Sequence, residues 1–237
     1  MELEVGDATV HWVEHGRGSP VLVLHGAGVD HREAEACFDP ALAGGDVHRR
    51  IYPDLPGMGR STAPPSLTSA DDVLDILKGF VDEVVGTDDV LLVGHSAGAY
   101  YAQGYTARHP DRVAGLALIC PLLAGTHDVP AHAPVTARDD LGDAGLRDYF
   151  VLQTPEMLAR YEQYVSPAAE LVDTAAMERI GQRWELTTPP GKPYAGPVLL
   201  IAGRRDSTVG WAATADLFLA ALLGDWLRRA AAPGSNA

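Results

Sequence analysis

The stretch that most constrains the fold is residues 90–98, which read Val-Leu-Leu-Val-Gly-His-Ser-Ala-Gly: an apolar strand that runs into a G-x-S-x-G turn. The residues after the turn, 97–109, are expected to form a helix. Gly94 and Gly98 lack the side chains that would clash where a strand reverses sharply into a helix around a strained serine. Such a turn holds the Ser96 hydroxyl at the tip of a sheet, beside helix amides that suit a developing oxyanion. This context favours a nucleophilic serine over an incidental one.

Strands and helices alternate along most of the chain, which predicts a mostly parallel sheet. The first helix follows a strand over a short stretch, 32–38, and the second, 70–85, has its apolar residues at helical spacing. The expected strands are 3–5, 9–13, 21–24, 48–52, 90–93, 113–119 and 197–202.

The alternation stops between residues 121 and 193, a stretch with prolines, charges and two expected helices at 155–164 and 168–184. An insertion on the side of the sheet that bears the serine would form a helical cap over it. The predicted organisation is a core of residues 1–120 and 194–230, a cap insertion of residues 121–193 and a flexible tail of residues 231–237.

Composition limits the kinds of molecule that the protein is expected to bind. The 237 residues suffice for one domain with a substantial core, and the net charge of −14 argues against nucleic acid, whose phosphates would be repelled. The two cysteines, Cys37 and Cys120, indicate neither a disulfide framework nor a zinc site, and Cys120 is expected to be a buried free thiol. The N-terminus has no signal-peptide features and no stretch is apolar enough to span a bilayer, so a cytoplasmic location without membrane contact is expected.

Four motifs occur together and in order: H-G-A-G at 25–28, D-L-P-G-M-G-R-S at 54–61, G-H-S-A-G at 94–98 and G-R-R-D at 203–206. With them the chain resembles the α/β-hydrolase family, in the cap-bearing branch that contains serine esterases, aminopeptidases and carbon–carbon hydrolases. The resemblance implies a mostly parallel α/β sheet flanked by helices.

The resemblance also implies roles for individual residues. Ser96 matches the nucleophile, the backbone amides of Ala27 and Ala97 match the oxyanion donors, and Asp206 matches the acid that orients a catalytic histidine. Asp54 is expected to hold its glycine-rich loop in place. The residues that would support these loops are His25, Gly26, Gly94 and Gly98. No metal and no organic cofactor is expected.

The sequence lacks a histidine at the place where the family pattern has the catalytic one. The resemblance places it after Asp206, in a loop beyond one more strand, yet no histidine follows His132 in this sequence. The residues after Asp206 lead almost directly to a helix with apolar positions from Leu219 to Leu227. The last edge strand and its histidine loop are therefore predicted to be missing. The preceding strand, 198–202, would then form an exposed edge, which predicts reduced stability or self-association.

Two functions stay open. One is a serine hydrolase that cleaves an ester, amide or related acyl bond of a small molecule through a Ser96 acyl-enzyme, with activity impaired because a triad member is missing. The other is a non-catalytic protein of the same fold, which binds a small ligand; the chain could equally be an internally shortened form of an active enzyme. His127 and His132, in the predicted cap, are the candidate replacement bases, whereas His95 is expected to point away from Ser96. Dehalogenase and epoxide hydrolase chemistry is disfavoured, because it places a carboxylate at the elbow.

Overall fold

The computed structural model describes residues 1–44, 47–123, 129–187, 193–212 and 214–215. Its sheet has seven strands in the order β1-β2-β4-β3-β5-β6-β7. β1 and β4 each pair antiparallel with β2, and the remaining pairs are parallel. This confirms the predicted α/β class and the mostly parallel sheet. The strands are β1 (Glu2–Val5), β2 (Ala8–His15), β3 (Ser19–Leu24), β4 (His48–Pro53), β5 (Val90–His95), β6 (Val113–Ile119) and β7 (Val198–Ile201).

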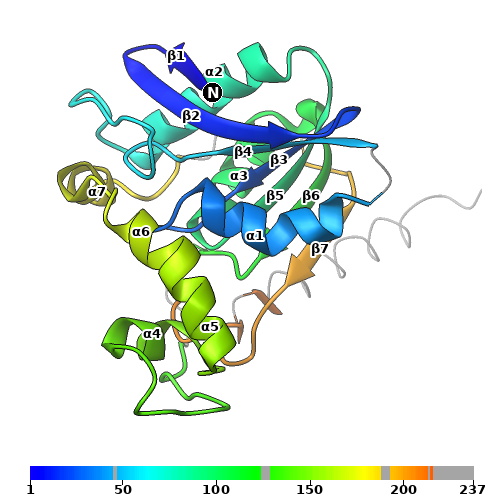
Figure 1. The fold of residues 1–237 in the computed structure, drawn as a ribbon. Coiled ribbons are helices and arrows are strands. Elements are labelled where there is room, and N and C mark those ends of the chain that lie inside the picture. The colour runs from blue at the N-terminus through cyan, green and yellow to red at the C-terminus, as the bar shows by residue number, and fades with distance from the viewer. Residues whose placement is uncertain (45–46, 124–128, 188–192, 213, 216–237) are drawn as a thin grey trace, which may run out of the picture.

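Helices cover both faces of this sheet (Figure 1). The α1 helix (His31–Leu42) packs on one face, and α2 (Ala70–Val84) and α3 (Ala97–Arg108) lie on the other. The central strand β3 serves both layers: Val21 and Val23 belong to the cluster on the α1 side, while Leu22 and Leu24 belong to the larger core on the α2 and α3 side. A short 3-10 turn (Pro110–Arg112) joins α3 to β6. Strands buried on both faces explain the continuous apolar runs of the sequence.

The three helices predicted between residues 32 and 109 are confirmed, and the first of them is longer than expected. α1 begins after Asp30, whose side chain accepts a hydrogen bond from the Arg32 amide, and it continues to Leu42, beyond the expected end at residue 38. Pro40 lies inside this helix but not in its first turn.

The segment between β6 and β7 is helical, and it lies beyond the end of the sheet toward which β7 points (Figure 1). The single helix expected over 168–184 was wrong: the chain turns after α6, and Asp173 starts a new helix by accepting a hydrogen bond from the Ala176 amide. The division into core and cap remains a prediction. The elements are α4 (Ala144–Tyr149), α5 (Pro155–Arg160), a π-helical turn (Tyr161–Val165), α6 (Ser166–Ala169) and α7 (Thr174–Gly181).

Some expectations fall on residues that the structure does not describe. The terminal helix around Leu219 to Leu227, the tail of residues 231–237 and His127 all lie outside the described residues. Within the described part of the chain, no helix is long and apolar enough to cross a membrane.

The strands at the two edges of the sheet are β1 and β7. On β7, no strand of the described residues pairs with the side that faces away from β6. Val198, Leu199 and Ile201 on this strand are 50%, 55% and 48% exposed. We propose that two copies of the chain pair through this edge, because unpaired strand groups beside apolar side chains favour strand addition. Self-association that increases from low to high micromolar concentration is expected in analytical ultracentrifugation.

A charge on the edge is expected to weaken this association. Leu199→Lys should shift the protein toward the monomer, because a lysine on an edge strand opposes pairing. Leu171→Lys is the matched control: Leu171 is a similarly exposed leucine, 47% accessible, in the turn between α6 and α7. A wild-type protein that stays monomeric at every concentration would contradict the proposal.

Candidate active site

Ser96 sits between the last residue of β5 and the first residue of α3, in a backbone conformation that is unusual for a serine. Its φ of 53° lies in the left-handed region, as the strained turn requires. The turn is held by its own backbone: the Ser96 amide donates to the Ile119 carbonyl at 3.0 Å, and the Ser96 carbonyl accepts from the Tyr100 and Leu122 amides. The strained elbow expected from the sequence is present.

Glycines allow the elbow to pack closely against the sheet. A Cβ on Gly98 would lie 2.3 Å from the Leu24 carbonyl oxygen, and one on Gly94 would lie 2.5 Å from the Ala99 Cα. Gly26, in the facing loop, is also tightly placed, because a Cβ there would be 3.4 Å from the Ser96 Cβ. Gly94 and Gly98 therefore need glycine for a steric reason, while a side chain at Gly26 would press against His95 and Ser96.

The elbow opens into a cavity of about 480 Å³. Ser96 lines it together with Ala27, His132 and Asp206, which come from distant parts of the chain. Ala97 is the first residue of α3, and the first amides of a helix have no partner within it. The structure thus brings three of the predicted site residues, Ala27, Ser96 and Asp206, to one cavity.

His95 lines the same cavity as Ser96. That its side chain points away from Ser96 stays a prediction. A Cβ on Gly26 would lie 3.3 Å from His95 Nδ1 and 3.4 Å from the Ser96 Cβ, so both side chains border this glycine. His95 Nδ1 is 3.8 Å from Glu33 Oε1, which is too far for a hydrogen bond.

Asp206 follows β7 and is fixed by the turn that it begins. Its Oδ1 accepts hydrogen bonds from the Thr208 amide at 2.9 Å and the Val209 amide at 3.0 Å. Its own amide donates to the Gly203 carbonyl. The carboxylate is therefore oriented by backbone amides at the wall of the cavity.

His132 belongs to the segment between β6 and β7 and reaches the cavity from there. Its Nδ1 lies 3.2 Å from the Ser207 hydroxyl oxygen, next to Asp206 in the sequence. Its Nε2 is buried and has no hydrogen-bond partner among the described residues. Of the two histidines considered as replacement bases, His132 is placed at the cavity, whereas His127 lies outside the described residues.

His25 is structural, as expected. It is fully buried, its Nδ1 donates to the Gly26 carbonyl at 2.7 Å, and its Nε2 accepts from the Leu55 amide at 2.8 Å. Burial lowers the pKa of His25, so the ring stays neutral in this arrangement. His25 therefore connects the loop of Ala27 to the loop after β4.

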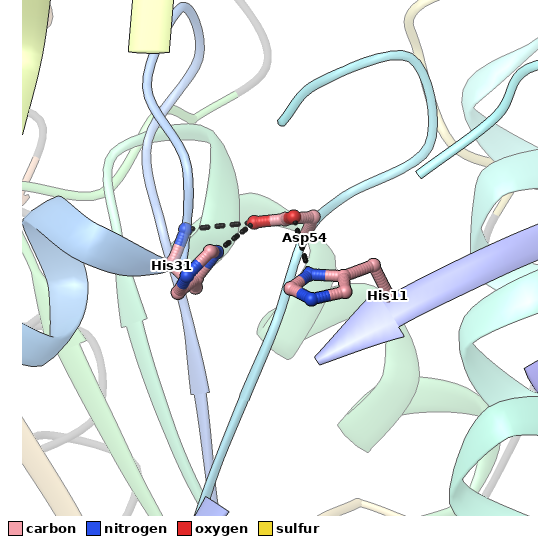
Figure 2. Close-up of side chains that lie close together, drawn as sticks. All are labelled: His11, His31 and Asp54. Carbon is pink, nitrogen blue, oxygen red and sulfur yellow. Dashed lines mark hydrogen bonds and ion pairs between the residues drawn. The ribbon is translucent and has the colours of Figure 1, made fainter. Parts of the chain in front are cut away.

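Asp54 anchors the glycine-rich loop, also as expected (Figure 2). Each carboxylate oxygen accepts two hydrogen bonds: Oδ1 from the amide and Nδ1 of His31, and Oδ2 from His11 Nδ1 and the Arg60 amide. Burial alone would raise the pKa of Asp54, but the hydrogen bonds from His31 and the Arg60 amide outweigh it and lower the pKa. Burial alone would lower the pKa of His31, but the hydrogen bond to Asp54 and its negative charge outweigh that effect and raise the pKa of the ring.

The donor set of this cluster also resembles a metal site. One nitrogen of His11, one of His31 and one Asp54 oxygen lie within 4.8 Å of one another. Both nitrogens nevertheless point at the carboxylate, whose oxygens already accept four hydrogen bonds (Figure 2). Hydrogen bonding accounts for the whole arrangement, and it holds the loop.

Three features of the cavity were missed from the sequence. Glu33 was predicted only as part of the helix at 32–38, with no role at the cavity. Residues 148–151 line the cavity from the end of α4 without a recognisable motif. Cys120, expected to be buried, is half-buried in the wall with a φ of 44°, and burial raises the pKa of its thiol.

Comparisons with known proteins agree on the fold. A family model described as "Alpha/beta hydrolase family" matches residues 21–235. A solved structure, an alpha/beta superfamily hydrolase from Oenococcus oeni PSU-1, superposes with a TM-score of 0.81 at 25% identity, over 92% of this chain and 85% of that chain. The family match begins within β3 and includes every later strand and helix of the described chain.

Curated relatives include hydrolases of several kinds as well as an acyltransferase and a decarboxylase. The chain is 29% identical to a 2-hydroxymuconate semialdehyde hydrolase from Pseudomonas sp. (strain CF600), over 92% of this chain and 78% of that protein. It is also 29% identical to an (E)-2-((N-methylformamido)methylene)succinate hydrolase from Acinetobacter baylyi, over 50% of this chain and 44% of that protein. The chain thus spans less than half the length of the Acinetobacter protein. With the serine elbow, the mostly parallel sheet and a family match over most of its length, the chain belongs to the alpha/beta hydrolase family.

Proposed function

We propose that this protein is a serine hydrolase that cleaves an ester, amide or related acyl bond of a small molecule. The observation that carries the proposal is the strained Ser96, which shares one cavity with Ala27, Asp206 and His132. Serine at the elbow separates this chain from hydrolases that use a carboxylate there. The hydrolase relatives support the general reaction, and the identity of the substrate stays open.

In the proposed reaction, the Ser96 hydroxyl oxygen attacks the acyl carbon of the substrate while His132 Nε2 accepts the hydroxyl proton. The amides of Ala27 and Ala97 stabilise the negative charge that develops on the acyl oxygen. The bond to the leaving group then breaks, and His132 returns the proton to the leaving group. Water attacks the acyl-enzyme in the second half, His132 again accepts a proton, and the acid is released with Ser96 restored.

The activity is expected to be low for a family member. In a complete triad the acid holds the histidine in the productive tautomer and stabilises the imidazolium. Here His132 Nδ1 is bonded to the Ser207 hydroxyl, and the Asp206 carboxylate is bonded to the Thr208 and Val209 amides. Among the described residues the acid makes no hydrogen bond to this histidine, so it does not hold the ring in the productive tautomer.

Pre-steady-state hydrolysis of p-nitrophenyl butyrate tests the proposal. A burst of nitrophenol equal to the enzyme, with one butyryl group found on Ser96 by peptide mass spectrometry, is the expected result. Ser96→Ala should lose the burst and the modification. A folded protein that shows neither would favour the alternative, a non-catalytic ligand-binding protein of the same fold. A cytoplasmic location stays a prediction.

A further inference from the structure

One wall of the cavity contains an acidic side chain, Glu33, that has no role in the proposed hydrolysis. Glu33, in the first turn of α1, lines the cavity with Ser96 but is only 7% exposed. Its Oε2 atom is buried and has no hydrogen-bond partner among the described residues. Buried carboxylate oxygens are costly when unpaired, so an unpartnered one at a cavity wall points to a ligand group that pairs with it.

Helix capping does not account for Glu33. A glutamate at this position often reaches back to the amide of the capping residue, here Asp30. The Glu33 side chain instead lines the cavity. Its Oε1 accepts a long hydrogen bond from the Cys37 thiol at 3.6 Å and lies 3.8 Å from His95 Nδ1. Oε2 is left for another donor.

His95 adds a second unpaired atom to the same wall. Its Nδ1 is buried without a hydrogen-bond partner among the described residues, and it lies beside Glu33. The unpartnered carboxylate oxygen of Glu33 needs an N–H or O–H donor, and a primary ammonium has three N–H donors.

The other charged residues that line the cavity also favour a positively charged ligand group. Among the described residues, Asp148 and Asp206 line it together with Glu33, and Arg205 is the one guanidinium there. Arg205 also donates a hydrogen bond to the Ala133 carbonyl. The lining is therefore acidic on balance, which attracts a cation and repels a carboxylate.

We infer that Glu33 and His95 form a recognition site for a protonated amine, so that the preferred acyl substrate carries a primary ammonium group. That the amine is a substrate rests on the proposed function. The binding of an amine does not, because the site would bind it in a non-catalytic protein as well. Glu33 is here a specificity residue, and Ser96 carries out the reaction.

Binding to the Ser96→Ala variant tests the inference without any need for catalysis. Three probes of similar length differ at one end: N-acetylputrescine ends in an ammonium, N-pentylacetamide in a methyl group and δ-acetamidovalerate in a carboxylate. By calorimetry the ammonium probe is expected to bind about tenfold more tightly than the methyl probe, as a charge-assisted hydrogen bond provides. The carboxylate probe should bind most weakly.

Two substitutions on the Ser96→Ala background assign the effect to the buried carboxylate. Glu33→Gln keeps the shape of the side chain and should abolish the preference for the ammonium probe. Glu35→Gln removes the same charge from the same helix and should retain the preference, because Glu35 is bonded to His15 outside the cavity. Circular dichroism melts verify that both variants fold, and Glu33→Asp, which keeps the charge, should retain part of the preference.

Equal binding of the three probes, tighter binding of the carboxylate probe, or a preference that survives Glu33→Gln would overturn the inference. These outcomes are independent of the burst experiment. A protein with an ammonium preference but no acylation of Ser96 would refute the proposed hydrolysis and keep the amine site.

Discussion

Replacing Gly98 with alanine is expected to lower the free energy of unfolding by about 3 kcal/mol, at the upper end of the range for overpacked sites. The added Cβ would meet two buried carbonyl oxygens, those of Leu24 at 2.3 Å and His25 at 2.5 Å. Both atoms belong to the backbone at the end of β3, so neither can move aside without displacing the strand. The relief of the clash would shift Ser96, and reaction with an acylating reagent should fall with stability.

Gly181→Ala is the matched control for this substitution. Gly181 ends α7, and a Cβ there would have no atom within 4 Å. Its free energy of unfolding should stay within about 1 kcal/mol of the wild type, with a small gain from reduced freedom of the unfolded chain. Urea unfolding of both variants makes the comparison, and equal stabilities would show that the elbow tolerates a side chain.

Replacing Asp54 with asparagine is expected to cost about 3 kcal/mol of stability at neutral pH, because it leaves buried partners of a charge without their acceptor. The wild-type carboxylate accepts four hydrogen bonds, and asparagine has one oxygen to offer. Asp75→Asn is the control: its carboxylate is 74% exposed and pairs with Arg108 at 3.2 Å, an exposed contact expected to contribute less than about 1 kcal/mol.

The effect of Asp54 should depend on pH with a definite sign. Its pKa is lower in the folded protein than in the unfolded chain, so the stabilisation is present above the unfolded value and is lost as the pH falls. The difference between wild type and Asp54→Asn should therefore shrink below about pH 4. A difference that stays constant between neutral and acidic pH would show that the carboxylate charge is not what holds the loop.

The sequence allowed the sheet and the elbow to be predicted because local rules govern both. Apolar runs such as residues 21–24 indicate buried strands, and Gly94 and Gly98 indicate a close approach of backbone to backbone. The structure confirms both readings, since each glycine would clash if it had a side chain. The structural role of Asp54 was predictable for a similar reason, from its place in a glycine-rich loop.

The cavity could be predicted only in part, because its walls depend on packing between distant segments. The position of His132 depends on the path of a segment without a recognisable motif, and nothing in its neighbours indicates contact with Ser207. The sequence places Glu33 in the first turn of a helix but does not indicate which side of that helix faces the cavity.

The central claim is that Ser96 is an activated nucleophile with His132 as its base, and labelling by a fluorophosphonate with intact-mass detection tests it most directly. The wild type should gain one phosphonyl group, Ser96→Ala none, and His132→Gln should react about a hundredfold more slowly. His127→Gln, which removes the other candidate histidine, should react at the wild-type rate. A well-folded wild-type protein that gains no phosphonyl group, or equal rates in the wild type and His132→Gln, would contradict the account.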